Sequence, residues 1–173
     1  MIRTTIKLAA VAVAAMTFGG QALAQQNTAK VTTTGTATIA AAITLTENSP
    51  LAFGKITKPS VGGTSNTVTL DKATCATSIT GGTGNAAVVG GGATCATYTV
   101  GGEAGAAYNI TGGTALTMTG PGGATLAVAL DKTITSGVVG TTGTFKIGGS
   151  FPVTDTTATG AYSGTFDVTV TYQ

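Results

Sequence analysis

The clearest pattern in the chain is an alternation of apolar and polar residues at its C-terminal end. Residues that share one face occupy every second position up to the penultimate one: Tyr162, Gly164, Phe166, Val168, Val170 and Tyr172. The positions between 162 and 172 are filled by Thr, Ser and Asp. Because successive side chains of a strand point to opposite faces, this pattern predicts a half-buried β-strand over residues 162–172. The edge of such a strand pairs either within its own sheet or with another chain.

A second alternation lies near the N-terminus. One face carries Val31, Thr33, Gly35, Ala37, Ile39, Ala41, Ile43 and Leu45. This run is long for one strand, so two interpretations stay open. Residues 25–38 form an extension in front of a domain that spans residues 39–173, or residues 31–46 form a single strand that bends at Gly35 through a bulge.

The rest of the chain alternates short strand-like runs with glycine-rich turns. Apolar spacing typical of a helix is absent, whereas Thr and Val favour strands and the 27 glycines supply turns. One of the expected turns is Gly148-Gly149. The pattern predicts strands at residues 31–46, 51–56, 67–70, 94–100, 107–111, 115–119, 125–130, 144–147 and 162–172. We expect an all-β fold, an Ig-like antiparallel β-sandwich that is either complete or one strand short.

The first 24 residues have the organisation of a secretory signal peptide. Arg3 and Lys7 precede a short apolar run, and Ala22-Leu23-Ala24 is a small-x-small cleavage site. The apolar run is shorter than the roughly 20 residues that a membrane-spanning helix needs, so no membrane span is expected. The sequence therefore predicts an exported protein.

Charge argues against two kinds of partner. Once Arg3 and Lys7 leave with the leader, six lysines face six acidic residues, and the net charge is about zero. A nucleic-acid binder needs a positive surface to displace counterions from phosphates. We expect neither nucleic acid nor an anionic membrane surface as a partner.

Cys75 and Cys95 are the only cysteines of the chain. In an exported protein two cysteines at this spacing are expected to form a disulfide, which closes a loop and stabilises the fold by about 3 kcal/mol. The glycine-rich segment 78–94 between them is expected to be a loop that cannot pack by itself. A metal site is not expected, because the chain has no His and no further Cys.

Catalysis has few candidate residues. Without His or a free Cys the usual general base and thiol nucleophile are missing. Glu47 and Glu103, the only two glutamates, could pair with Asp155 or Asp167 as glycosidase carboxylates, but sequence spacing does not give their separation in space. The sequence indicates a protein that is not an enzyme and needs no cofactor.

The two ends of the predicted domain resemble chaperone-usher pilin subunits. Gly160, the fourteenth residue from the end, and the alternating residues up to Tyr172 resemble the terminal β-motif with which that family binds its periplasmic chaperone. Leu51-Ala52-Phe53-Gly54 is similar to an element of the spore-coat-U-like branch of those pilins, and to the start of an uncharacterised family of secreted proteobacterial β-domains. Pilins of this branch carry a Cys in the first strand, which residues 31–46 lack, so the uncharacterised family is the nearer relative.

The resemblance implies a surface subunit of a fimbrium that assembles by β-strand donation. Its partners would be copies of itself or related subunits, a periplasmic chaperone and an outer-membrane usher. Residues 162–172 would flank the acceptor groove, and Gly35 would match the donor glycine that fits a shallow pocket. The donor face would consist of Val31, Thr33, Gly35, Ala37 and Ile39. The alternative is a self-contained adhesion or binding module on the cell surface.

Overall fold

The structure is a computed structural model that describes residues 28–141 and 143–173. The predicted signal peptide, residues 1–24, lies outside these ranges. The chain divides into two units, Met1–Ala37 and Thr38–Gln173. Residues 28–37, the described part of the first unit, contain no helix or strand, and their side chains are exposed.

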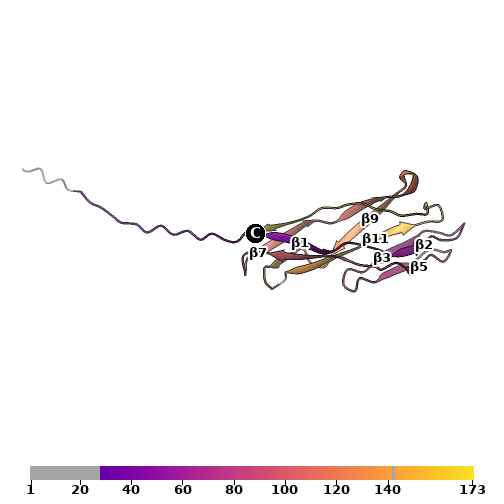
Figure 1. Cartoon of the computed structure of the whole chain (residues 1–173), viewed down its shortest axis with the longest axis horizontal. Coiled ribbons are helices and arrows are strands. Elements are labelled where there is room, and N and C mark those ends of the chain that lie inside the picture. Colours follow the sequence, from indigo (N-terminus) through magenta and orange to yellow (C-terminus); the bar gives the residue numbers. More distant parts are fainter. Residues whose placement is uncertain (1–27, 142) are drawn as a thin grey trace, which may run out of the picture. The chain divides into compact units, whose positions relative to one another are not determined.

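The second unit is the folded domain, and nearly all of its secondary structure consists of β-strands (Figure 1). Its described residues form the strands β1 (Thr44–Ser49), β2 (Lys55–Thr57), β3 (Asn66–Leu70), β4 (Thr77–Thr80), β5 (Ala87–Gly90), β6 (Ala96–Gly101), β7 (Ala107–Gly112), β8 (Ala115–Thr119), β9 (Thr125–Lys132), β10 (Ser136–Val138), β11 (Thr144–Val153) and β12 (Val168–Tyr172). A single 3-10 turn, η1 (Pro121–Gly123), connects β8 to β9.

The strands pair antiparallel throughout and form a sandwich. The largest sheet joins β1, β6, β11, β3 and β4, and it also contains β9 and β8. A second sheet has the order β10-β7-β12, and a small third one pairs β2 with β5. The predicted all-β antiparallel β-sandwich is confirmed.

The core lies where the inward faces of these sheets meet. Residues of β3 and β6 alternate between buried and more exposed positions, as the period of a strand requires, and those of β11 do so except at Gly148, which is also buried. The rings of Tyr98 and Phe145 stack with centroids 5.1 Å apart, and Phe53 meets Phe151 edge-on at 5.0 Å. The largest fully buried side chains are those of Tyr108, Phe145, Leu70, Ile147, Val68 and Val128.

The predicted strand over residues 31–46 is wrong for most of its length, because β1 begins only at Thr44. A strand is stable when its backbone groups pair with a neighbour, and residues 31–43 belong to no ladder among the described residues. Alternation in the sequence predicts which side chains would share a face if the segment formed a strand. It does not show whether a neighbouring strand is present to pair with the backbone.

The predicted turn at Gly148-Gly149 is also wrong, because both glycines lie inside β11. A Cβ atom on Gly148 would collide with the carbonyl oxygen of Leu70 in β3, and one on Gly149 would come within 2.7 Å of the Ala129 carbonyl oxygen in β9. These glycines therefore let two neighbouring strands approach β11 closely. In the sequence, a Gly-Gly pair with this role cannot be distinguished from a turn.

The segment between the two cysteines is not the unpacked loop that was expected. It contains β4, which pairs with β3, and β5, which pairs with β2. Both strands are held by backbone hydrogen bonds, and Ile79 of β4 packs against the core, so a segment with few apolar residues still forms strands. Every residue of β5 is exposed.

Candidate functional site

The most unusual feature of the domain is a gap between its first and last strands. Backbone ladders lead from β1 to β6, β11, β9 and β8, and a bridge between Thr119 and Ser163 continues the path to the C-terminal segment. The path does not close, because no backbone hydrogen bond within the described residues joins positions 44–57 to positions 160–172. Each of the two terminal strands therefore keeps one unpaired edge.

The C-terminal wall of this gap has the alternation that the sequence predicts. Tyr162, Phe166, Val168, Val170 and Tyr172 are half-buried, whereas the polar residues between them are exposed. Regular pairing is confined to β12, which lies along β7, and to the Ser163 bridge. The predicted strand over residues 162–172 is thus interrupted.

The interruption has a cause in the neighbouring strands. β7 ends at Gly112 and β8 begins at Ala115, and Gly112 and Gly113 both have positive φ. The kinked partner leaves residues 164–167 without a regular ladder, and the Gly113 N–H donates instead to the carbonyl oxygen of Asp167 at 2.8 Å.

Gly160 and Gly164 allow the C-terminal segment to lie close to its neighbours. Gly160 has φ +147, and a Cβ atom there would collide with the ring of Pro121 in η1. At Gly164 a Cβ atom would overlap the carbonyl oxygen of Thr117 in β8. Both residues that the sequence singled out for assembly therefore have a packing role within the domain.

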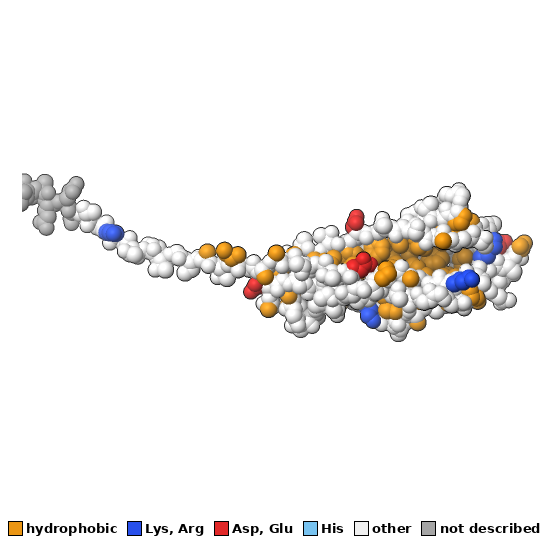
Figure 2. Space-filling view, viewed as in Figure 1, with side chains coloured by type: hydrophobic (Ala, Val, Ile, Leu, Met, Phe, Trp, Pro, Cys, Tyr) orange, Lys and Arg blue, Asp and Glu red, His pale blue; other side chains and the backbone are white. Residues whose placement is uncertain are grey.

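The N-terminal wall is formed by β1 and the residues that follow it. Ile43, Leu45, Leu51 and Ile56 are half-buried against the core, and Phe53 is buried. Apolar residues of both walls thus remain incompletely covered. Figure 2 shows orange side chains gathered in a strip along the domain.

At one end the gap widens into a cavity of about 860 Å³. One wall comes from residues 51–58 and the other from residues 157–162, so the cavity belongs to the same gap. Between these walls it is lined by Met118, Leu126, Phe151 and Val153. We call the gap with this cavity the terminal groove. It offers an apolar floor between two strand edges that still have free backbone groups.

The other end of the terminal groove is bridged by hydrogen bonds of Tyr172. Its hydroxyl donates to the carbonyl oxygen of Ala41 at 2.8 Å and accepts from the Glu103 N–H at 2.7 Å. The Glu103 carboxylate accepts from the Ala41 N–H at 3.0 Å. Sequence reasoning treated Glu103 only as a candidate catalytic group and missed this contact, because nothing in the pattern brings residues 41, 103 and 172 together.

The predicted donor residues form no strand in the described chain. Val31, Thr33, Gly35, Ala37 and Ile39 are all exposed, with 86% of the Val31 side chain and 95% of the Ile39 side chain accessible to solvent. A Cβ atom at Gly35 would have no neighbour within 4 Å. Their donor role stays a prediction.

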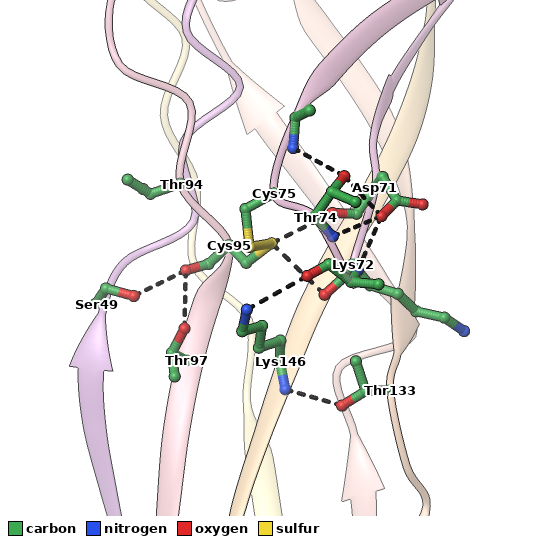
Figure 3. Close-up of a disulfide and its surroundings, with 12 residues drawn as sticks. Ser49, Asp71, Lys72, Thr74, Cys75, Thr94, Cys95, Thr97, Thr133 and Lys146 are labelled. Carbon is green, nitrogen blue, oxygen red and sulfur yellow. Dashed lines mark hydrogen bonds between the residues drawn. A yellow bond between two sulfur atoms is a disulfide. The ribbon is translucent and has the colours of Figure 1, made fainter.

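The predicted disulfide between Cys75 and Cys95 is confirmed, with Cα atoms 5.2 Å apart (Figure 3). Cys75 follows β3 at the end of a turn that Asp71 organises. The Asp71 carboxylate accepts hydrogen bonds from Thr74 N at 2.7 Å, Thr74 Oγ1 at 2.9 Å and Ala73 N at 3.0 Å. These bonds hold the pKa of Asp71 below its ordinary value of 3.8. A disulfide is typical of proteins outside the reducing cytoplasm.

The other polar candidates are dispersed. Glu47 lies in β1 opposite Tyr98, whose pKa is raised by burial and, less strongly, by the Glu47 charge. Asp155 accepts a hydrogen bond from the Gly62 N–H. Within residues 28–141 and 143–173 no three His, Cys, Asp or Glu side chains form a group suited to a metal ion. No helix among these residues is long and apolar enough to cross a membrane.

Fold and groove together define a class: an antiparallel β-sandwich, cross-linked by one disulfide, with an apolar groove between its first and last strands. The chain belongs to the family described as Domain of unknown function (DUF4402), whose model matches residues 43–172. The match extends from the start of the N-terminal wall to Tyr172, so it includes both walls of the groove. Comparisons with curated proteins and with solved structures found no match.

Proposed function

We propose that this protein is an exported structural subunit that assembles by β-strand donation. In this proposal the terminal groove of one copy accepts the N-terminal segment of another copy or of a related subunit. The observation that carries the proposal is the gap between β1 and the C-terminal strand, which has two unpaired edges and half-buried apolar walls.

Physical chemistry favours a strand as the occupant of this groove. Free strand edges are templates for pairing with another chain, and soluble proteins normally cover or disrupt them. A strand inserted between β1 and β12 would pair its backbone on both sides and place alternate side chains on the apolar floor. A small molecule would leave most of these backbone groups unpaired.

The N-terminal segment has the properties of such an occupant. Val31, Ala37 and Ile39 lie on one face and are exposed in the free chain. Residues 31–39 span about 30 Å when extended at about 3.3 Å per residue, enough to cover β12, whose five residues span about 16 Å, and part of the interrupted segment before it. Burial of Val31 and Ile39 would contribute about 1.5 to 3 kcal/mol each, and covering the groove walls would add more.

The location follows from the same proposal. The predicted leader and the disulfide both support passage through an oxidising compartment outside the cytoplasm. By its resemblance to chaperone-usher pilins, the subunit would be held by a periplasmic chaperone, pass through an outer-membrane usher and join a fimbrium at the cell surface.

The test is the behaviour of the mature protein from the cell surface on an SDS gel. Strand-donated assemblies should migrate as a ladder without boiling and collapse to monomer after heating. A monomer under both conditions would contradict donation and favour a self-contained adhesion module.

Deletion of residues 25–38 tests the donor. The truncated subunit should fold and form the Cys75–Cys95 disulfide, yet fail to produce a ladder. If the deletion abolishes folding itself, residues 25–38 are an integral part of the domain rather than a donor.

A further inference from the structure

Strand donation to a second copy raises a problem of competition. A segment tethered to its own domain reaches an effective concentration in the millimolar range, about a thousandfold above a typical micromolar subunit concentration. If residues 31–39 could turn back beside β1, they would fill their own groove before another copy reached it. A subunit that assembles by donation therefore needs a feature that prevents this return.

The hydrogen bonds of Tyr172 lie where the return would have to begin. A hairpin that places residues 31–39 beside β1 needs its turn at residues 40–43, directly before Thr44. Within this stretch Ala41 has both backbone groups engaged, its N–H by Glu103 and its carbonyl oxygen by Tyr172. We call this arrangement of Ala41, Glu103 and Tyr172 the clasp.

The clasp is built into the domain by contacts on several sides. Tyr172 pairs with Tyr108 of β7 at the end of β12, and its hydroxyl also accepts the Glu103 N–H. Gly102 has φ +150 and lies so close to the Tyr172 hydroxyl that a Cβ atom would collide with it. The Tyr172 hydroxyl can therefore occupy this position only because residue 102 is a glycine.

The sequence of the same stretch also disfavours a hairpin. Tight two-residue hairpins need residues that adopt positive φ, above all Asn-Gly or Asp-Gly. Residues 40–42 are three alanines, which do not favour that conformation.

We propose that the clasp fixes the point at which the N-terminal segment leaves the domain, so that this segment cannot enter its own groove and is available to a second copy. The inference rests on the proposed strand donation. Glu103 and Tyr172 act here as positioning residues for the donor segment.

The first test is Tyr172→Phe combined with Glu103→Ala in the full mature chain. The ring at position 172 stays in the groove wall, but every side-chain hydrogen bond to Ala41 is lost. We expect the monomer share on an unboiled gel to rise severalfold. The monomer should also melt at a higher temperature than the wild-type monomer, because its own segment fills the groove. A merely structural role for the clasp would lower the melting temperature instead.

Two controls separate these outcomes. Thr64→Val removes a hydroxyl that is hydrogen-bonded to the Thr83 hydroxyl, outside the clasp and both groove walls, and should leave the ladder unchanged. Deleting residues 28–37 from the clasp variant should lower the monomer's melting temperature to the wild-type value or below it, because the self-filling segment is gone and the clasp hydrogen bonds are still missing.

A second variant supplies a turn and leaves Glu103 and Tyr172 unchanged. Ala41→Asn with Ala42→Gly introduces an Asn-Gly hairpin and should also raise the monomer share and the melting temperature. If the wild-type protein forms a ladder and both variants form the same ladder, the clasp proposal is overturned and the proposed function is not. A wild-type protein that is monomeric without boiling would overturn the proposed function and the clasp with it.

Discussion

Ile39 offers the most direct measurement of strand donation. Its side chain is 95% exposed in the described structure, so truncating it removes no contact that stabilises the free domain. Donation would transfer the same side chain into the apolar groove of another copy. The substitution Ile39→Ala should therefore weaken assembly and leave the folding of the subunit unchanged.

The expected magnitude follows from the carbon atoms that are removed. Ile39→Ala deletes three carbons, and each buried methylene contributes about 0.8 kcal/mol, so the association free energy should fall by about 2.4 kcal/mol. This difference corresponds to a dissociation constant about 60-fold higher. The expected loss of association free energy is several times larger than the effect of most surface substitutions on stability, about 0.5 kcal/mol.

The assay is sedimentation of the mature protein over a range of concentrations, with urea unfolding of the monomer as a separate measurement. Val61→Ala is the matched control, because Val61 is 96% exposed but lies outside the predicted donor. It should change neither quantity. The reasoning is refuted if Ile39→Ala assembles like the wild type, or if it destabilises the monomer as much as it weakens assembly.

Three further predictions concern the domain itself. Cys75→Ala with Cys95→Ala should lower the free energy of unfolding by about 3 kcal/mol, because the disulfide spans a sequence separation of 20. With Cys95→Ala kept, Cys75→Gly in place of Cys75→Ala should recover about 1 kcal/mol of the free energy of unfolding, since residue 75 has φ +58. Urea titrations measure both free energies. Gly148→Ala should destabilise by about 1 to 3 kcal/mol on thermal melting, whereas Gly35→Ala should not change the melting temperature. Because the pKa of Asp71 is lowered in the fold, its carboxylate stabilises the protein above pH 3.8, and this contribution is lost as the pH falls through the lowered value. Unfolding measured from pH 6 to pH 2 should lose this dependence in Asp71→Asn, and an identical pH profile would contradict the role of the turn.

The fold class and the C-terminal wall could be predicted from the sequence because both depend on local patterns. Thr and Val in short runs between glycines favour strands whatever their neighbours, and the period of two decides which residues point inward. Phe166, Val168 and Val170 are half-buried as the alternation predicts. The disulfide could be predicted because a chain with a predicted leader and two cysteines offers one pairing.

The remaining features depend on partners that are distant in sequence. β1 starts at Thr44 because that is where β6 offers a ladder, and no local signal marks this boundary. Gly148-Gly149 resembles a turn, yet it serves the close approach of two strands to β11. The clasp unites residues 41, 103 and 172, and only the folded sheets bring these three together.

The position of the disulfide is consistent with a groove that must remain stable while it is empty. Cys75 follows β3 and Cys95 precedes β6, and both strands pair with β11 rather than forming the C-terminal wall. About 3 kcal/mol from the cross-link is a large part of the 5 to 15 kcal/mol that stabilises a typical domain. This contribution does not depend on whether a strand occupies the groove. Under the proposed strand donation, an unfilled subunit would therefore persist in an oxidising compartment until a donor arrives, whereas a reducing compartment would remove the cross-link that stabilises the open sandwich.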